Sequence, residues 1–106
     1  MFYSRVSGFV FHADEEGIKI ISPDRKHVFY LNDLASFIFL SLDQPKTLGK
    51  IISNVMAEYQ VEKAVAQKDV KLWLEEAIKM GFIQADSKKI NPVINFLKKI
   101  KHRVFS

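Results

Sequence analysis

Residues 17–52, GIKIISPDRKHVFYLNDLASFIFLSLDQPKTLGKII, change their hydrophobic period once, and that change predicts the fold. Before Asn32, two short runs at 18–21 and 27–31 are rich in β-branched and aromatic residues, which is typical of strands. The sequence SPDRK between them is a turn signal, because proline presets its backbone angle and aspartate bonds back to the chain. We therefore expect two antiparallel strands in this half of the stretch.

From Asn32 onward, the apolar residues recur at helical spacing. Asn32 suits the N-cap of a first helix, which we expect to end near residues 43–45, and Thr47 suits the cap of a second. A third helix should run from about residue 65 to residue 80. It should stop at Gly81, because glycine adopts the left-handed conformation that ends many helices.

The flanking segments complete the predicted fold. Residues 8–12 read as a further strand, separated from 18–21 by the charged turn 13–17, and residues 82–83 as a short extended piece. Asn91-Pro92 is expected to open a final amphipathic helix that reaches about residue 104. The expected fold class is α+β and winged-helix-like, with a three-stranded antiparallel sheet followed by three helices. We expect a recognition domain at 1–86 and a basic helical tail at 87–106.

Composition narrows the function. The chain has 106 residues and no cysteine, so disulfides, thiolate metal sites and a cysteine nucleophile are excluded. The N-terminal residues lack the pattern of a signal peptide, and no apolar run reaches the roughly 18 residues of a membrane span. We expect a cytoplasmic protein without a cofactor.

The positive charge of the chain is concentrated at its end. Residues 1–86 hold ten lysine and arginine residues against twelve acidic ones, whereas residues 87–106 hold six cations and no acid. A DNA-binding domain normally carries its positive charge on the folded surface that meets phosphate. The charge map therefore disfavours the main alternative from another class, a winged-helix DNA-binding regulator.

The sequence offers no catalytic constellation. The three histidines show no metal-ligand spacing, and neither a phosphate-binding loop nor a nucleophile motif is present. Glu75 and Glu76 are adjacent on a predicted helix and point 100° apart, so they cannot work as an acid–base pair. We expect no catalytic residue and no metal ligand, and an enzyme is the weakest interpretation.

Three features of the sequence together form a recognisable family pattern. The strand–turn–strand ends at Leu31-Asn32 directly before a helix with Ala35, and DQPKTL opens the second helix. The third feature is residues 68–83, KDVKLWLEEAIKMGFI. Together, over about residues 7–85, these features resemble the PqqD-like family, which includes recognition elements of ribosomally made, modified peptides. Gln44 departs from this pattern where a glycine is common, and Ala77 where a larger aliphatic residue is usual.

The resemblance implies a peptide-binding protein. Members of the family bind the leader segment of a precursor peptide, which adds as a strand to the open sheet edge beside the third helix. The expected partners are a precursor peptide and a separate modifying enzyme such as a radical, cyclase or protease component, with no nucleic acid. The peptide-binding residues expected here are His27, Val28, Phe29, Tyr30, Leu31, Asp69, Leu72, Trp73, Glu76 and Met80.

The helical periodicity of residues 65–80 agrees with a groove. Val70, Leu74, Ala77 and Gly81 form one stripe suited to a core, and Asp69, Leu72, Glu76 and Met80 form a second stripe, with Trp73 between the two. Leu72 and Met80 on the second stripe could instead pack on a neighbouring loop or on the C-terminal helix. Likewise, the strand edge at 27–31 could be shielded by the tail or by a dimer mate.

Two further alternatives remain open from the sequence. The basic tail could dock on its own domain, on a dimer mate or on the partner enzyme, or could contact an anionic membrane or nucleic acid. The whole chain could also act as a structural subunit that stabilises an enzyme complex without touching its substrate. Oligomeric state, monomer or dimer, is not decided by these patterns.

Overall fold

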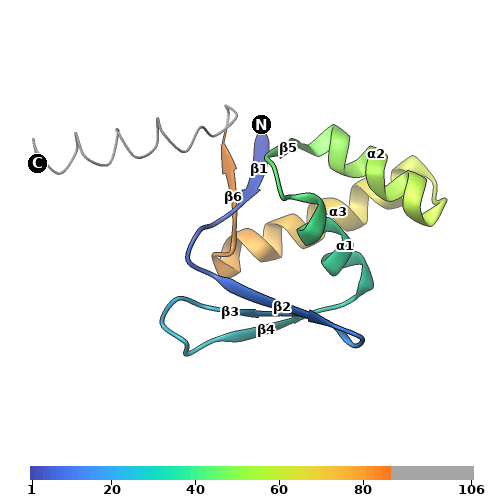
Figure 1. Cartoon of the computed structure of the whole chain (residues 1–106). Coiled ribbons are helices and arrows are strands. Elements are labelled where there is room, and N and C mark those ends of the chain that lie inside the picture. Colours follow the sequence, from blue (N-terminus) through green and yellow to red (C-terminus); the bar gives the residue numbers. More distant parts are fainter. Residues whose placement is uncertain (87–106) are drawn as a thin grey trace, which may run out of the picture.

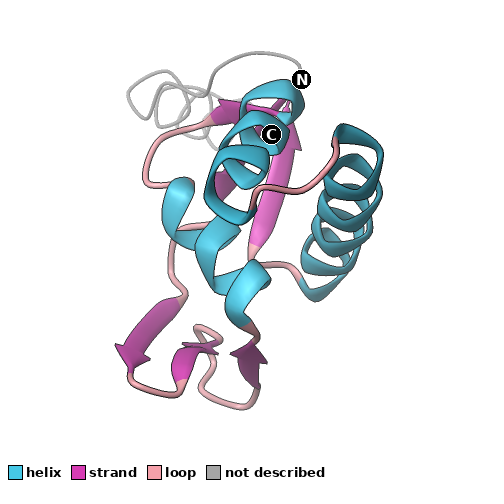
Figure 2. Ribbon diagram, turned by 90° about the vertical axis from the view of Figure 1, so that its right-hand side faces the viewer, coloured by secondary structure: helices cyan, strands magenta, loops and turns pink. Residues whose placement is uncertain are grey.

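The computed structural model describes residues 1–86, and the helix expected at 92–104 lies outside that range. A three-stranded antiparallel sheet, the meander, consists of β2 (Val10–Asp14), β3 (Gly17–Ile21) and β4 (Val28–Leu31) in that order. The helices are α1 (Asp33–Ser41), α2 (Leu48–Tyr59) and α3 (Lys63–Met80). Figure 1 shows the helices on one side of the meander, and the view of Figure 2, turned by 90°, shows the same arrangement.

A second small sheet closes the other side of the domain. Its strands are β5 (Lys46–Thr47), β1 (Phe2–Arg5) and β6 (Ile83–Asp86), with β1 in the centre. The α+β class and the order of the meander and the helices are confirmed. β1 and β5 were not expected from the sequence, and the short extended piece after Gly81 is one strand of this sheet.

Local hydrogen bonds explain where the helices begin and end. The Asn32 side chain accepts a bond of 2.8 Å from the Ala35 N–H, and Thr47 Oγ1 accepts one of 3.2 Å from Lys50. Each cap satisfies one of the N–H groups that a helix start leaves unpaired. Gly81 has a φ of 94° and ends α3, as its sequence position predicted.

The boundaries of several elements differ from the expectation, and β4 begins at Val28 rather than at residue 27. The turn expected at 13–17 is shorter, because Asp14 pairs with Gly17 and only two residues connect β2 to β3. Gly17 has a φ of 128°, and a Cβ there would lie 3.0 Å from the Leu31 carbonyl oxygen. This tight glycine turn extends both strands into the charged segment. Two other starts differ as well. β2 begins two residues later than expected, and α3 begins at Lys63 rather than near 65.

The core lies between the meander and the helices. Ile18, Ile20 and Leu31 enter it from the sheet. The helices, β6 and the residues that directly adjoin them supply the remaining buried side chains, which include Ala35, Ile38, Phe39, Leu42, Ile51, Ile52, Val55, Ala66, Val70, Leu74, Ala77, Phe82 and Ile83. Each large apolar side chain buried in this way contributes about 1.5–3 kcal/mol. The core stripe predicted for α3 is confirmed except for Gly81, which is exposed at the helix end.

Arg5 connects β1 to β2 and α1 through its side-chain contacts. Its guanidinium lies 4.5 Å from the ring centre of Phe39 and 5.0 Å from that of Phe11. Arg5 Nε also donates a hydrogen bond of 2.9 Å to the Phe39 carbonyl. Partial burial lowers the pKa of Arg5, yet these contacts to aromatic faces and to a carbonyl suit a guanidinium that stays charged.

Candidate functional site: a strand edge beside a cleft

The outer edge of β4 is the first element of the site. Within residues 1–86, β4 pairs with β3 alone, in a register that sets Phe29 opposite Ile20. The Ser22 N–H donates a bond of 3.0 Å to the His27 carbonyl. Because antiparallel pairs alternate between bonded and non-bonded positions, Ile20 and Phe29 form the next bonded pair. The N–H and C=O groups of Val28 and Tyr30 therefore point away from β3, along the open edge.

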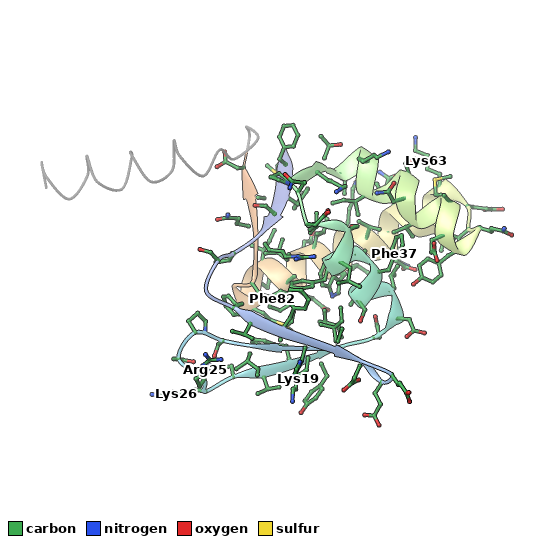
Figure 3. The ribbon with its side chains drawn as sticks, in the orientation of Figure 1. Lys19, Arg25, Lys26, Phe37, Lys63 and Phe82 are labelled. Atoms are coloured by element: carbon green, nitrogen blue, oxygen red, sulfur yellow. The ribbon has the colours of Figure 1, made fainter. Side chains whose placement is uncertain are left out.

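The side chains of β4 divide between two faces of the meander. Phe29 is half-buried and Leu31 buried on the face toward the helices. Val28 is 45% exposed and Tyr30 is 79% exposed on the opposite face, where Figure 3 also shows Lys19. This settles which of the two sets on the strand enters the core, and it leaves an aromatic side chain exposed on an edge strand.

A cleft of about 410 Å³ runs between β4 and α3, and we call it the edge cleft. Its lining residues are Val28, Phe29, Tyr30, Leu31, Asn32, Ala35, Trp73, Glu76, Ala77, Met80 and Phe82. The structure thus brings together all the binding residues expected from the sequence except His27, Asp69 and Leu72. Its wall is mainly apolar, and its long side is a strand whose outward backbone groups have no strand partner within residues 1–86.

His27 borders a second hollow of about 530 Å³, the turn cleft, which lies at the start of β4. Its lining residues are Phe9, Ser22, Pro23, Asp24, His27, Phe29 and Met80. Phe29 and Met80 line both hollows, so the turn cleft adjoins the edge cleft. A peptide lying along β4 would pass from one hollow into the other.

The turn before β4 is held by hydrogen bonds to two side chains. Asp24 Oδ1 accepts bonds from Ser22 Oγ and from the Lys26 N–H, and Ser22 Oγ accepts one from the His27 N–H at 3.1 Å. The bond from Ser22 is the main reason that the pKa of Asp24 lies below its ordinary value. His27 Nδ1 lies 3.8 Å from Asp24 Oδ1. These contacts fix the point at which β4 begins.

Phe82 forms the floor where the cleft meets the core. It is 1% exposed, and Figure 3 shows it between the helices and the meander. Its ring centre lies 5.4 Å from that of Phe29, 6.1 Å from Trp73 and 6.2 Å from both Phe9 and Phe39. The cleft wall is therefore continuous with the core through aromatic contacts.

Asp69 and Leu72 lie on α3 but line neither hollow. Leu72 is 51% exposed and Met80 is 47% exposed, so both lie off the core stripe. Leu72 precedes Glu76 by one helical turn, and Asp69 precedes it by two. The second stripe of α3 therefore continues past the edge cleft, and only its C-terminal part borders the hollow.

Glu76 is the charged residue of the edge cleft. The carboxylate makes no ion pair within residues 1–86. In the same part of the chain, no group of three histidine or acidic side chains is placed to hold a metal ion. None of the helices there is both long and apolar enough to cross a membrane.

Sequence reasoning missed four lining residues of the edge cleft: Asn32, Ala35, Ala77 and Phe82. The sequence indicates Asn32 as a helix cap, and its place at the end of β4 is the signal that could add it to the site. The helical spacing of Ala77 indicates a core position, although a small side chain there leaves room for a hollow. Phe82 carried no signal, because its contact with Trp73 depends on the turn at Gly81.

Comparison with known proteins agrees with this architecture. A family model described as coenzyme PQQ synthesis protein D (PqqD) matches residues 17–83. Among curated protein sequences, none matches the chain at a significant level.

Three solved structures share the fold. "TbiB1 in Complex with the TbiA(beta) Leader Peptide" is 16% identical with a TM-score of 0.71, covering 80% of this chain and 99% of that one. "Lasso peptide synthetase B1 complexed with the leader peptide" is 16% identical with a TM-score of 0.67, covering 78% and 98%. The PqqD truncation of Methylobacterium extorquens PqqCD is 19% identical with a TM-score of 0.67, covering 79% and 89%. Since the family model matches more than half of the residues of this chain, the chain belongs to the PqqD family.

Proposed function

We propose that this chain binds the leader segment of a ribosomally made precursor peptide and presents it to a separate modifying enzyme. The leader adds as a fourth strand to the meander, along the outer edge of β4. The chain itself catalyses no step. The observation that carries this proposal is the open edge at Val28 and Tyr30 beside the edge cleft.

The backbone of β4 would supply affinity. An incoming strand satisfies the outward N–H and C=O groups of Val28 and Tyr30, which otherwise bond to water. Its side chains alternate, so every second one points toward α3 and enters the cleft between Trp73 and Met80. Hydrogen bonds between main chains do not depend on the sequence of the peptide. The cleft therefore provides the selectivity between peptides.

The relatives support this function. Two of the structures with the same fold are described as complexes with a leader peptide. The third is described as "a functional and stand-alone" recognition element for ribosomally synthesised and modified peptides. The edge of β4 and the lining residues of the edge cleft lie within residues 17–83, the part of this chain that the family model matches.

Presentation follows from binding. A leader held on β4 keeps the attached core peptide near whatever enzyme contacts this domain, and tethering raises the local concentration to about millimolar for a short flexible linker. The partner would be a radical, cyclase or protease component. His27, Asp69 and Leu72, which lie just beyond the edge cleft, are available to contact a leader longer than the hollow.

Amide hydrogen exchange tests the proposal directly. The probes are synthetic peptides that cover the short reading frames adjacent to the gene for this chain. Binding should slow exchange at Val28 and Tyr30 while leaving Phe29 unchanged, because the Phe29 N–H is already bonded to Ile20. Proline at a ladder position of the peptide should abolish the effect, since it removes a donor. Slowing confined to residues beyond 86 would show that the tail, not β4, is the binding element.

The DNA-binding alternative gives a different result. A regulator of this fold would read DNA with its third helix, but residues 69–80 hold three acids and two lysines. We expect residues 1–86 to show no salt-dependent binding to a DNA duplex. Retained duplex binding with a steep salt dependence would favour the regulator.

A further inference from the structure

Glu76 differs from every other residue around the edge cleft. The remaining lining side chains are aliphatic, aromatic, the thioether of Met80 or the neutral amide of Asn32, so among residues 1–86 Glu76 supplies the only formal charge on the wall. No cation within residues 1–86 pairs with it. The adjacent Glu75 is also exposed to solvent but lines neither hollow.

A bound strand changes the surroundings of this carboxylate. Without a peptide, water solvates Glu76 on its open side. A strand laid along β4 covers part of the cleft and removes some of that water, which is costly for a charged group unless a partner replaces it. An arginine or lysine on the strand supplies the partner, whereas an acidic residue adds repulsion. The same carboxylate thus favours one class of peptide and rejects another.

We propose that Glu76 is a specificity-determining residue, and that it selects peptides carrying a lysine or arginine two residues from an aliphatic or aromatic side chain. This inference rests on the proposed function. The apolar side chain occupies the wall formed by Trp73, Met80 and Phe82, and the cation meets Glu76.

The spacing follows from strand geometry. Side chains of a strand alternate between faces, so two residues that both point toward α3 are separated by an even number of positions. The nearest such positions are two residues apart, about 6.6–6.8 Å along the strand. One helical turn between residues of α3, such as Glu76 and Met80, rises about 5–6 Å. Neighbouring inward side chains on the peptide therefore match neighbouring positions on the helix.

A peptide-display selection tests this without knowledge of the natural leader. A library of random dodecapeptides is selected against the full chain and against its Glu76→Gln, Glu76→Arg and Glu75→Gln variants. Glu75→Gln is the matched control, since it removes a charge from the neighbouring position on the same helix. Peptides selected by the parent chain are then synthesised with the cation intact, or replaced by glutamine or glutamate, and their affinities are measured.

The parent chain and Glu75→Gln should both enrich the cation-containing spacing, and Glu76→Arg should enrich acids at the same position. Replacing the peptide cation by glutamine should weaken binding to the parent about three- to tenfold, the scale of a partly screened ion pair. The same replacement should have little effect on binding to Glu76→Gln. Enrichment without a cation, or a cation preference that Glu76→Arg retains, would overturn the assignment to Glu76.

Amide exchange separates this failure from a failure of the proposed function. Selected peptides should slow exchange at Val28 and Tyr30. If they do so but show no dependence on Glu76, the binding edge is right and the specificity assignment is wrong. If no peptide is selected, or if Val28 and Tyr30 are unaffected, both proposals are wrong.

Discussion

Trp73 and Phe82 lie with ring centres 6.1 Å apart and ring planes tilted by 52°. Trp73 is half-buried on the wall of the edge cleft, while Phe82 is buried beneath it. Trp73 is also the single tryptophan of the chain. The tryptophan fluorescence of the protein therefore reports on one side of the proposed binding site.

Leader addition should change the emission of Trp73, because a strand on β4 replaces water at the exposed part of the indole ring. A titration followed at the tryptophan emission maximum gives the affinity. The same peptide with proline at a ladder position is the control and should leave the spectrum unchanged. Equal spectral changes with both peptides would mean that binding does not use the edge of β4.

Met80→Gln should weaken leader binding by roughly 1–3 kcal/mol, the scale of an interface anchor, without changing the net charge. Thermal stability should change little, because Met80 is half-exposed and its loss leaves no buried cavity. Calorimetric titration and thermal unfolding measure the two effects separately.

Leu74→Ala is the matched core change on the same helix. It should lower the free energy of unfolding by about 2–5 kcal/mol, because Leu74 is only 2% exposed. Leu72→Gln, on the exposed stripe but outside both hollows, should affect binding less than Met80→Gln. If Met80→Gln unfolded as readily as Leu74→Ala, Met80 would be a core residue and the cleft would be misplaced.

Removing the Ser22 hydroxyl should raise the pKa of Asp24 toward its ordinary value of 3.8, because the Ser22 hydrogen bond is the main cause of its lowering. A group whose pKa is lowered by folding stabilises the folded state above its unfolded pKa. That contribution disappears as the pH falls through the folded pKa. The turn before β4 should therefore loosen on the acidic side of pH 4.

Carbon-detected NMR titration of the Asp24 carboxyl group, in the parent and in Ser22→Ala, measures this shift. A synthetic peptide of residues 22–27 provides the unfolded reference. Identical titration of Asp24 in the peptide and in the parent protein would show that the turn does not hold the carboxylate.

Signals within a few residues of one another predicted most of the meander and the helices. The caps at Asn32 and Thr47 and the helix end at Gly81 depend on bonds to residues three or four positions away. Such bonds can be read from sequence, because the residue types that form them are few. The alternation of β4 likewise identified two possible faces but not which face is buried.

Pairing between strands that are distant in the chain could not be predicted from the sequence. β1 pairs with β6, so Phe2 lies opposite Asp86 and Arg5 opposite Ile83. No local pattern connects strands so far apart, and four-residue segments carry little periodicity. The sequence does not predict the turn cleft for the same reason, since this hollow joins Phe9, Pro23 and Met80 from three distant segments.

The pairing of β1 with β6 also bears on synthesis. β1 leaves the ribosome before the other strands described in residues 1–86, and β6, which completes its sheet, is made about eighty residues later. At typical translation rates of about 5–20 residues per second, several seconds separate the two events. Meanwhile the meander and the helices can form from neighbouring segments, whereas Phe2 and Tyr3 cannot yet pair with β6. The sheet that contains β1 is therefore completed last, and a chaperone that shields β1 would act during that interval.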